Sequence, residues 1–432
     1  MTNPETARAM LALPEHKLRR ALSAELHLRR FPRFGSPARV LQVVMVSDEA
    51  ELSRDRAAAE DLCARFGVTP EPGKHFAAQL PGVYFVWERH AEFTSYSFIC
   101  PGPVETLFDH DPLARLPADW VARIPGEVLR ATHIVVLGPD TPAPDPETIA
   151  RYFPDPDHVS CLVARGMARI WSEFRVHEDG VGRLLIHDHG LGAGDLARLV
   201  QQIQELGNYR NMALLGLPAA QAEGGALRDL EDKLAQVTAE IAETAVSNGE
   251  DERLLGDLTH LAGQLAHLKA RTSYRMSATE AYGELVAERL KGLAPERIAG
   301  HPALTDFTER RLNPGLRTCR AFVRRLDDAA SRTALASSLL RTRVETVMER
   351  QSRDLLASMN QRARLQLRLQ QTVEGLSVVA ISYYALALAG YVFHAVQELV
   401  PTLNATLMSA LALPLIVGGV AWSIRRMTRR LH

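Results

Sequence analysis

The sequence contains little cysteine. Four residues in 432 are cysteine, they are scattered, and no Cys-x-x-Cys pair occurs; they are Cys63, Cys100, Cys161 and Cys319. This spacing argues against a zinc ribbon and against a redox-active dithiol, because both chemistries need closely paired thiols. We therefore expect reduced thiols in a cytoplasmic domain.

The chain also lacks a large net charge and an N-terminal apolar segment. The formal net charge is −1, which gives the whole molecule no electrostatic preference for nucleic acid, so no nucleic-acid partner is expected. The opening residues are polar and mixed, and we expect no signal peptide. The charge is uneven, however: residues 303–374 hold 14 Arg against 8 acidic residues, a difference of +6, which suits an anionic cytoplasmic leaflet.

Signatures of common enzymes are missing as well. The sequence has no Gly-x-Ser-x-Gly elbow, no His-Glu-x-x-His helix and no deaminase motif. Gly190, Gly192 and Gly194 resemble a glycine-rich loop before a helix, but the phosphate-loop Lys-Ser/Thr is absent and the spacing differs from the dinucleotide fingerprint. Asp195 is interpreted as an N-cap. We expect no enzymatic activity, no catalytic residues and no bound cofactor, a divalent cation being the one possible exception.

Two long apolar runs are present near the C-terminus. Residues 375–397 and 399–424 are runs of 23 and 26 residues without a formal charge, apart from Glu398 between them. A helix of about 20 residues at 1.5 Å each spans a hydrocarbon core of roughly 30 Å, so each run is long enough to cross a bilayer. A turn near Gln397 to Asn404, with Pro401 as a breaker, makes the two spans antiparallel. The alternative is a buried hairpin in a soluble core.

Basic residues flank both spans on one side and are missing from the turn. They are Arg362, Arg364 and Arg368 before the first span and Arg425, Arg426, Arg429 and Arg430 after the second. The positive-inside rule then places both ends of the hairpin in the cytoplasm. The prediction is a protein of the cell inner membrane with two spans and with cytoplasmic N- and C-termini.

The first half of the chain has the pattern of an α+β or α/β domain. Helical periodicity covers residues 15–31 and 49–66, and β-branched or alternating stretches predict strands at 38–47, 82–90, 92–99, 133–138, 159–164, 168–176 and 182–188. The second and third of these stretches are expected to be paired strands or one long bent strand. We assign residues 1–217 to this cytoplasmic domain.

Helical patterns fill the remainder. After a linker at 222–225, an antiparallel helical hairpin is predicted over 226–293, with Asn248 and Gly249 as breakers and leucines from Leu254 to Leu268 at coiled-coil-like spacing. A stalk helix follows over 303–374, with Pro314 in its early turns, and it runs unbroken into the membrane. The remaining segments are transmembrane helix 375–397, transmembrane helix 405–424 and a basic cytoplasmic tail, 425–432.

Three stretches resemble an uncharacterised bacterial family of predicted membrane-anchored proteins, a domain-of-unknown-function family. They are Glu25-Leu-His27-Leu-Arg29, Trp87-Glu88-Arg89-His90-Ala91-Glu92-Phe93 and residues 362–384. The first is followed by Arg30 and Phe31 before Pro32, whereas the family usually has proline at once. The resemblance covers nearly the whole chain and implies a membrane anchor.

The architecture is also similar to that of CorA-type magnesium channels, which have a cytoplasmic domain, a long stalk helix and two C-terminal spans. In that group the first span ends in Gly-Met-Asn, which meets the hydrated ion. Here the matching position is Gly390-Tyr391-Val392, with Asn404 farther along. The resemblance therefore implies a CorA-like fold and an oligomer more than magnesium transport.

Glu88, His90 and Glu92 are the candidate metal ligands. Their alternation along an extended segment would place them on one face about 6 to 7 Å apart. Together with Glu25 and His27, or with His187, Asp188 and His189, they fit a nitrogen and oxygen metal site or an acid/base cluster. The alternative is a set of surface or hydrogen-bonded strand residues beside a turn.

Polar residues recur every seven positions near the first span. Gln370, Ser377, Tyr384 and Tyr391 follow this spacing. A polar heptad is typical of a wetted lumen in a bundle of such helices, while the alternative is local satisfaction and packing on the second span.

The patterns together favour an integral inner-membrane protein that acts as a homo-oligomeric membrane anchor or scaffold, with a cytoplasmic protein as a possible partner. A divergent CorA-like divalent cation channel is the first alternative. A membrane-bound enzyme or metal-binding domain using Glu88, His90 and Glu92 is the second.

Overall fold

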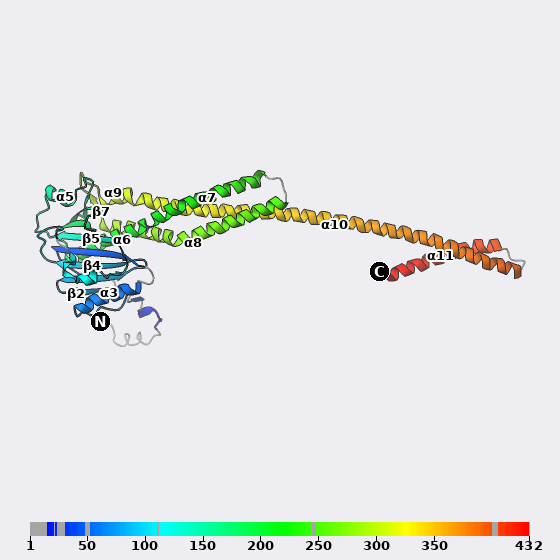
Figure 1. Cartoon of the computed structure of the whole chain (residues 1–432), viewed down its shortest axis with the longest axis horizontal. Coiled ribbons are helices and arrows are strands. Elements are labelled where there is room, and N and C mark those ends of the chain that lie inside the picture. The colour runs from blue at the N-terminus through cyan, green and yellow to red at the C-terminus, as the bar shows by residue number, and fades with distance from the viewer. Residues whose placement is uncertain are drawn as a thin grey trace, which may run out of the picture. The chain divides into compact units, whose positions relative to one another are not determined.

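A computed structural model describes residues 15–20, 22–23, 31–47, 52–109, 112–243, 248–399 and 405–431 (Figure 1). These residues divide into two units. The first comprises Met1–Thr238 and Leu258–Ala334, and the second comprises Ala239–Asp257 and Leu335–His432. Of the helix predicted over 15–31, only short pieces fall within the described residues, and the stretch from Glu25 to Arg29 lies outside them.

A mixed β-sheet forms the centre of the first unit. The strands found in the described residues are β1 (Ala38–Val46), β2 (His75–Leu80), β3 (Val83–Arg89), β4 (Thr94–Pro101), β5 (Glu127–Leu137), β6 (Val159–Val163), β7 (Ala168–Val176), β8 (Gly182–Asp188) and β9 (Glu296–Arg297). Their order in the sheet is β2-β3-β4-β1-β5-β8-β7-β6-β9. β5 and β8 pair in parallel, and the other pairs are antiparallel. All seven predicted strands are present, and β3 and β4 are paired strands. β2 and β9 were not predicted.

One face of the sheet packs against helices from later in the chain. Val40, Ile134 and Ile186 of the sheet share a hydrophobic core with Val200 and Ile203 of α6 (Ala193–Leu214). The C-terminal part of α8 (Asn248–Leu293) and α9 (Leu304–Arg311) contribute to the same core. The side chains of every second strand residue point to this face, as the two-residue period of a strand requires.

The opposite face is covered by helices from the first half of the chain. Here α3 (Leu52–Arg65) and α4 (Ala118–Val121) lie over an aromatic core that includes Phe85, Phe98 and Trp120. A second hydrophobic cluster, which includes Ile149 of α5 (Pro146–Tyr152) and Leu185 of β8, also lies on this face. The short 3-10 helix η1 (Pro112–Arg115) precedes α4 in the chain.

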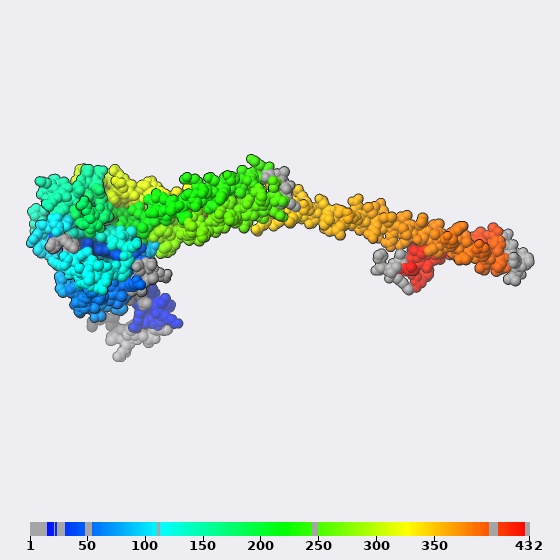
Figure 2. Space-filling view, in the orientation of Figure 1, coloured from blue at the N-terminus to red at the C-terminus, as the bar shows by residue number. Residues whose placement is uncertain are grey.

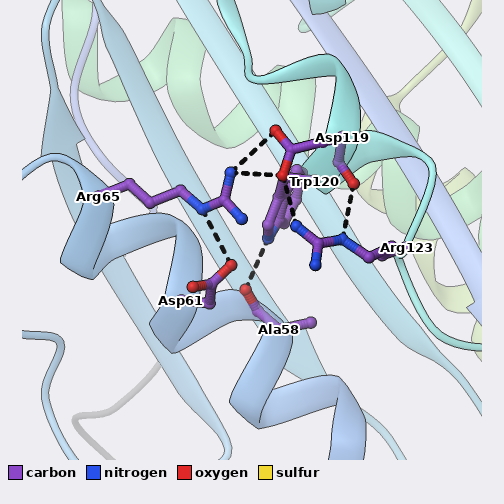
Figure 3. Close-up of polar contacts among 6 residues, drawn as sticks. All are labelled: Ala58, Asp61, Arg65, Asp119, Trp120 and Arg123. Atoms are coloured by element: carbon purple, nitrogen blue, oxygen red, sulfur yellow. Dashed lines mark hydrogen bonds and ion pairs between the residues drawn. The ribbon is translucent and has the colours of Figure 1, made fainter.

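Polar contacts fix α4 on α3 (Figure 3). The indole nitrogen of Trp120 donates to the carbonyl of Ala58 at 2.7 Å, and the Arg65 guanidinium lies 2.9 Å from the Asp119 carboxylate. Arg65 also pairs with Asp61, and Asp119 pairs with Arg123. The N–H group of the buried indole is therefore hydrogen-bonded, and the ion pairs lie in the exposed region beside it.

Long helices occupy the rest of the chain. α7 (Gly216–Glu243) runs through residues 222–225, so the predicted linker there is wrong: these residues are helical. Asn248 and Gly249 begin α8 and do not end a helix, and Gly192, not Asp195, is the N-cap of α6. Asp195 lies in the first turn of α6, where a carboxylate still favours the helix dipole.

Ion pairs join α7, α8 and α10 (Asn313–Leu399) within the first unit. Glu223 of α7 pairs with Arg271 of α8, and Glu231 of α7 pairs with Arg325 of α10. Glu280 of α8 accepts from Arg320 of α10 at 2.8 Å. The leucines from Leu254 to Leu268 that suggested a helix seam are buried.

The C-terminal helices follow the predicted pattern with one difference. The stalk does not start as a single helix, because α9 ends at Arg311 and α10 begins at Asn313 with Pro314 in its first turn. From there α10 continues as one helix for 87 residues, and α11 (Ala405–Leu431) follows. The predicted turn residues Pro401 and Asn404 lie outside the described residues.

Both α10 and α11 contain a stretch that is long and apolar enough to cross a membrane. Only 6% of this stretch in α10 and 0% in α11 is buried by the rest of the described chain. In the space-filling view of Figure 2, the C-terminal parts of both helices, in orange and red, lie at the surface.

Candidate functional site

The predicted metal ligands lie at the hairpin that joins β3 to β4. β3 ends at Arg89 and β4 begins at Thr94, and the backbone N–H of His90 donates to the carbonyl of Phe93 at 2.8 Å. Glu92 therefore lies in a tight turn. The prediction that Glu88, His90 and Glu92 alternate along one extended segment is wrong, because the chain reverses after His90.

Glu88 and His90 lie together. Nε2 of His90 is 3.6 Å from Oε1 of Glu88, and both side chains are mostly buried. The imidazole of His90 also stacks on Phe93, with ring centroids 4.1 Å apart. This pair is held in place by the hairpin and by the buried ring of Phe93.

Glu92 is directed to a different partner. Its two carboxylate oxygens accept from Nη1 and Nη2 of Arg275 on α8 at 2.8 and 3.2 Å. Tyr282 lies on the same helix; burial, together with the negative charge of Glu92 and a hydrogen bond to it, raises the pKa of the Tyr282 hydroxyl. The bidentate pair ties the β3–β4 hairpin to α8, which explains a glutamate at this position.

His187, Asp188 and His189, the second group of candidate ligands, form hydrogen bonds with backbone groups. Nε2 of His187 lies 2.9 Å from the carbonyl of Thr141, and Nδ1 of His189 lies 2.9 Å from the carbonyl of Gly166. Asp188 accepts from Ser36 at 2.7 Å and from the backbone N–H groups of Gly190 and Leu191. The carboxylate of Asp188 thus stabilises the conformation of the glycine loop before α6 by accepting hydrogen bonds from the loop backbone.

Within the part of the chain that the structure describes, no group of three or more His, Cys, Asp or Glu side chains is arranged to hold a metal ion. Glu25 and His27, the further predicted ligands, lie outside that part. The metal site at Glu88, His90 and Glu92 stays a prediction, with the first two side chains adjacent and the third engaged by Arg275.

The heptad positions of the first span lie on α10 in the second unit. Gln370 donates to Glu374 at 3.3 Å, and the Ser377 hydroxyl donates to the carbonyl of Val373 at 2.8 Å. Tyr384 and Tyr391 are exposed. Local satisfaction therefore accounts for Gln370 and Ser377, while the lumen assignment for the four residues stays a prediction.

Two buried arginines are functional candidates that the sequence patterns did not indicate. Arg130 lies in β5 and Arg210 in α6, and both side chains belong to the buried set. The available signal was an arginine inside the apolar strand 127–137 and another on the apolar side of a helix, since arginine is seldom buried without a partner.

Comparison with known proteins identifies a family and no activity. No curated protein matches the chain, and no solved structure matches it. The CorA-type architecture, the cation pathway and the coiled-coil packing therefore stay predictions. One family model, described as a protein of unknown function, matches residues 14–431, which is nearly the whole chain. The chain thus belongs to the protein family of unknown function DUF3422, as the resemblance in its sequence indicated.

Proposed function

We propose that this protein is an integral membrane protein whose α10 and α11 both cross the bilayer, and that it serves as a homo-oligomeric anchor or scaffold. The observation that carries the proposal is the pair of long apolar stretches that the chain leaves uncovered. Soluble proteins rarely expose apolar patches of this extent, because water disfavours them. A hydrocarbon environment removes that penalty.

Basic residues support a cytoplasmic location for the sheet domain. Arginines precede the apolar stretch of α10, and Arg425 and Arg426 follow that of α11. By the positive-inside rule these flanks stay on the cytoplasmic side. An impermeant maleimide added to intact cells is then expected to label a Thr402→Cys variant, which lies in sequence between the two apolar stretches, and not a Thr428→Cys variant after the second stretch. The reverse labelling would contradict the proposed orientation.

An uncovered apolar face on α10 supports the oligomer. Met348, Leu355 and Met359 are spaced seven and four residues apart, so they lie on one face of the helix. All three are more than half exposed. A long helix is not stable alone in water and needs partner helices, and the proposed partner is the same helix of a second copy.

Membrane fractionation tests the anchor. The full chain should sediment with membranes and stay there during alkaline carbonate extraction. A Leu388→Arg/Leu415→Arg variant should be released or degraded, since arginine at the centre of a span costs about 2.5–3.5 kcal/mol per residue. A Leu355→Arg/Leu356→Arg variant is the matched control on the same helix outside the span, and it should remain in the membrane fraction. Release of the wild-type chain by carbonate alone would overturn the anchor.

The molar mass of the detergent-solubilised protein tests the scaffold. We expect the wild-type chain to form an oligomer, measured by light scattering after size exclusion. Leu355→Glu should shift the mass toward one chain, because it places a charge on the apolar face. Gln361→Glu adds the same charge elsewhere on α10 and should leave the mass unchanged. A monomeric wild-type protein would refute the homo-oligomer.

A further inference from the structure

A small cavity of about 70 Å³ lies between the sheet and α6, where β5, β7 and β8 come together. Arg130 and Thr132 of β5, Ser172 and Phe174 of β7, Gly182 of β8 and Arg210 of α6 are among its lining residues. β7 is irregular here, because its register with β8 shifts between Ser172 and Val176. All of these residues belong to the first unit.

Arg130 enters this region from the sheet, and among the described residues its side chain has only neutral acceptors. Its Nη1 donates to Oε1 of Gln42 and to Oδ1 of Asn208, both at 2.9 Å. The guanidinium lies close against α6, since a Cβ atom on Gly207 would come within 2.6 Å of it. The glycine at 207 thus gives a buried guanidinium room beside a helix.

Arg210 enters from the helix and meets two aromatic rings. Its guanidinium carbon is 4.2 Å from the ring centroid of Phe174 and 5.1 Å from that of Phe307. Phe174 has a φ of 53°, a left-handed backbone conformation that is uncommon for a side chain of this size and that accompanies the irregularity in β7. In the described chain, Arg210 has no hydrogen-bond acceptor and no carboxylate partner, although only 9% of its surface is exposed.

The two guanidinium groups are close enough to repel each other. Burial, and to a smaller extent the charge of Arg210, lower the pKa of Arg130 to about 9. Burial alone lowers the pKa of Arg210 to about 10. Neither group gains a compensating carboxylate among the described residues. Two buried positive charges with neutral partners are unfavourable, and an added negative charge would offset this.

We propose that this cavity binds a phosphate-sized oxyanion between Arg130 and Arg210. Guanidinium groups bind oxyanions through parallel N–H donors, and such charge-assisted hydrogen bonds are stronger than neutral ones. The volume suits a single small anion and is too small for a nucleotide. The bound anion would link strand β5 to helix α6, so it would stabilise the sheet unit in proportion to its concentration.

The test measures phosphate binding by the detergent-solubilised full chain, with calorimetry and thermal unfolding at constant ionic strength. We expect inorganic phosphate to bind and to raise the melting temperature, and acetate and chloride to do neither. Arg210→Met should weaken phosphate affinity at least about tenfold, because a charge-assisted contact is lost. It should also raise the melting temperature without phosphate, since an unpaired buried charge has been removed.

Two further variants separate binding from a structural role. Arg198 lies on the same helix, is exposed and pairs with Asp195, so Arg198→Met should bind phosphate as the wild type does. Arg210→Lys keeps the charge without the planar donors and should show intermediate affinity. If the wild-type chain binds no phosphate, or if acetate binds as well as phosphate, the proposal is overturned. A purely structural role for Arg210 predicts a lower melting temperature for Arg210→Met and no response to phosphate in any variant.

Discussion

The first and last parts of α10 belong to the same unbroken helix but differ in what covers their apolar side chains. Leu316, Phe322 and Leu326 near the start are buried, whereas Leu376, Leu388 and Tyr391 near the end are exposed. The exposed end is the more apolar of the two parts, because residues 375–397 carry no formal charge whereas the start of the helix holds several arginines and aspartates. Apolar composition alone therefore does not decide burial. A helix pattern therefore predicts an apolar face but not its partner, which can be the same chain, a second copy or a membrane.

Stability should change most when a covered apolar side chain is truncated, and little when an uncovered one is. Phe85 is fully buried, and its ring lies 5.2 Å from that of Phe98. Phe85→Ala should lower the free energy of unfolding by about 3–5 kcal/mol, because it leaves a cavity in the aromatic core. Leu388→Ala in α10 should change it by less than about 0.5 kcal/mol in detergent. Chemical unfolding followed by tryptophan fluorescence measures both. Equal losses would show that Leu388 is covered after all.

The next contrast concerns ion pairs. Glu92→Gln removes the charge from a mostly buried, bidentate pair with Arg275, so we expect a loss of about 1–3 kcal/mol. Asp119→Asn removes a charge from the exposed network with Arg65 and Arg123 (Figure 3) and should have a smaller effect, because solvent and salt screen it. The same unfolding measurement at low and high salt distinguishes the losses of the two variants, because salt should reduce the effect of Asp119→Asn more than that of Glu92→Gln. A larger salt dependence for Glu92→Gln than for Asp119→Asn would contradict this ranking.

Much of the fold could be predicted from local pattern. The strand at 38–46 is β-branched and apolar, and it lies in the interior of the sheet between β4 and β5, as such a strand should. β2 was missed because HFAAQL has little β-branched character, and β9 was missed because two residues carry no pattern. Residues 222–225 contain two glycines and still form helix, since Leu227, Leu230 and Leu234 beyond them are buried and hold α7 in place.

The candidate sites were less predictable, because they depend on tertiary pairing. Glu92 alternates with Glu88 and His90 in the sequence, but its partner is Arg275, 183 residues away. Arg130 and Arg210 are brought together by a strand and a helix that local periodicity cannot place side by side. Sequence alone predicts which residue types carry chemistry. Their neighbours across the core come only from the fold.

Two glycines of α7 offer a third contrast between covered and open positions. A Cβ atom on Gly216 would lie 2.2 Å from Oγ1 of Thr279 and 2.9 Å from its Cβ, whereas Gly224 has open space. Gly216→Ala should destabilise the protein by about 1–3 kcal/mol through overpacking against α8. Gly224→Ala should stabilise it by up to about 1 kcal/mol, because alanine favours helix. Thermal unfolding of the two variants beside the wild type gives the signs. A stabilising Gly216→Ala would mean that α7 and α8 separate easily at this point.

The rate at which a thiol is labelled tests burial without changing the stability of the protein. Cys63 and Cys161 are free and buried, and burial raises the pKa of both thiols to about 11. At pH 8 these thiols stay protonated, so N-ethylmaleimide should label them at least about 100-fold more slowly than a free cysteine, because the thiolate is the reactive form. A Ser358→Cys variant on the uncovered part of α10 should label at the rate of an exposed thiol. Rapid labelling of Cys161 in the folded protein, at the rate seen for the introduced cysteine, would show that the sheet is no better covered than the helix and would remove the contrast between the two parts of the molecule.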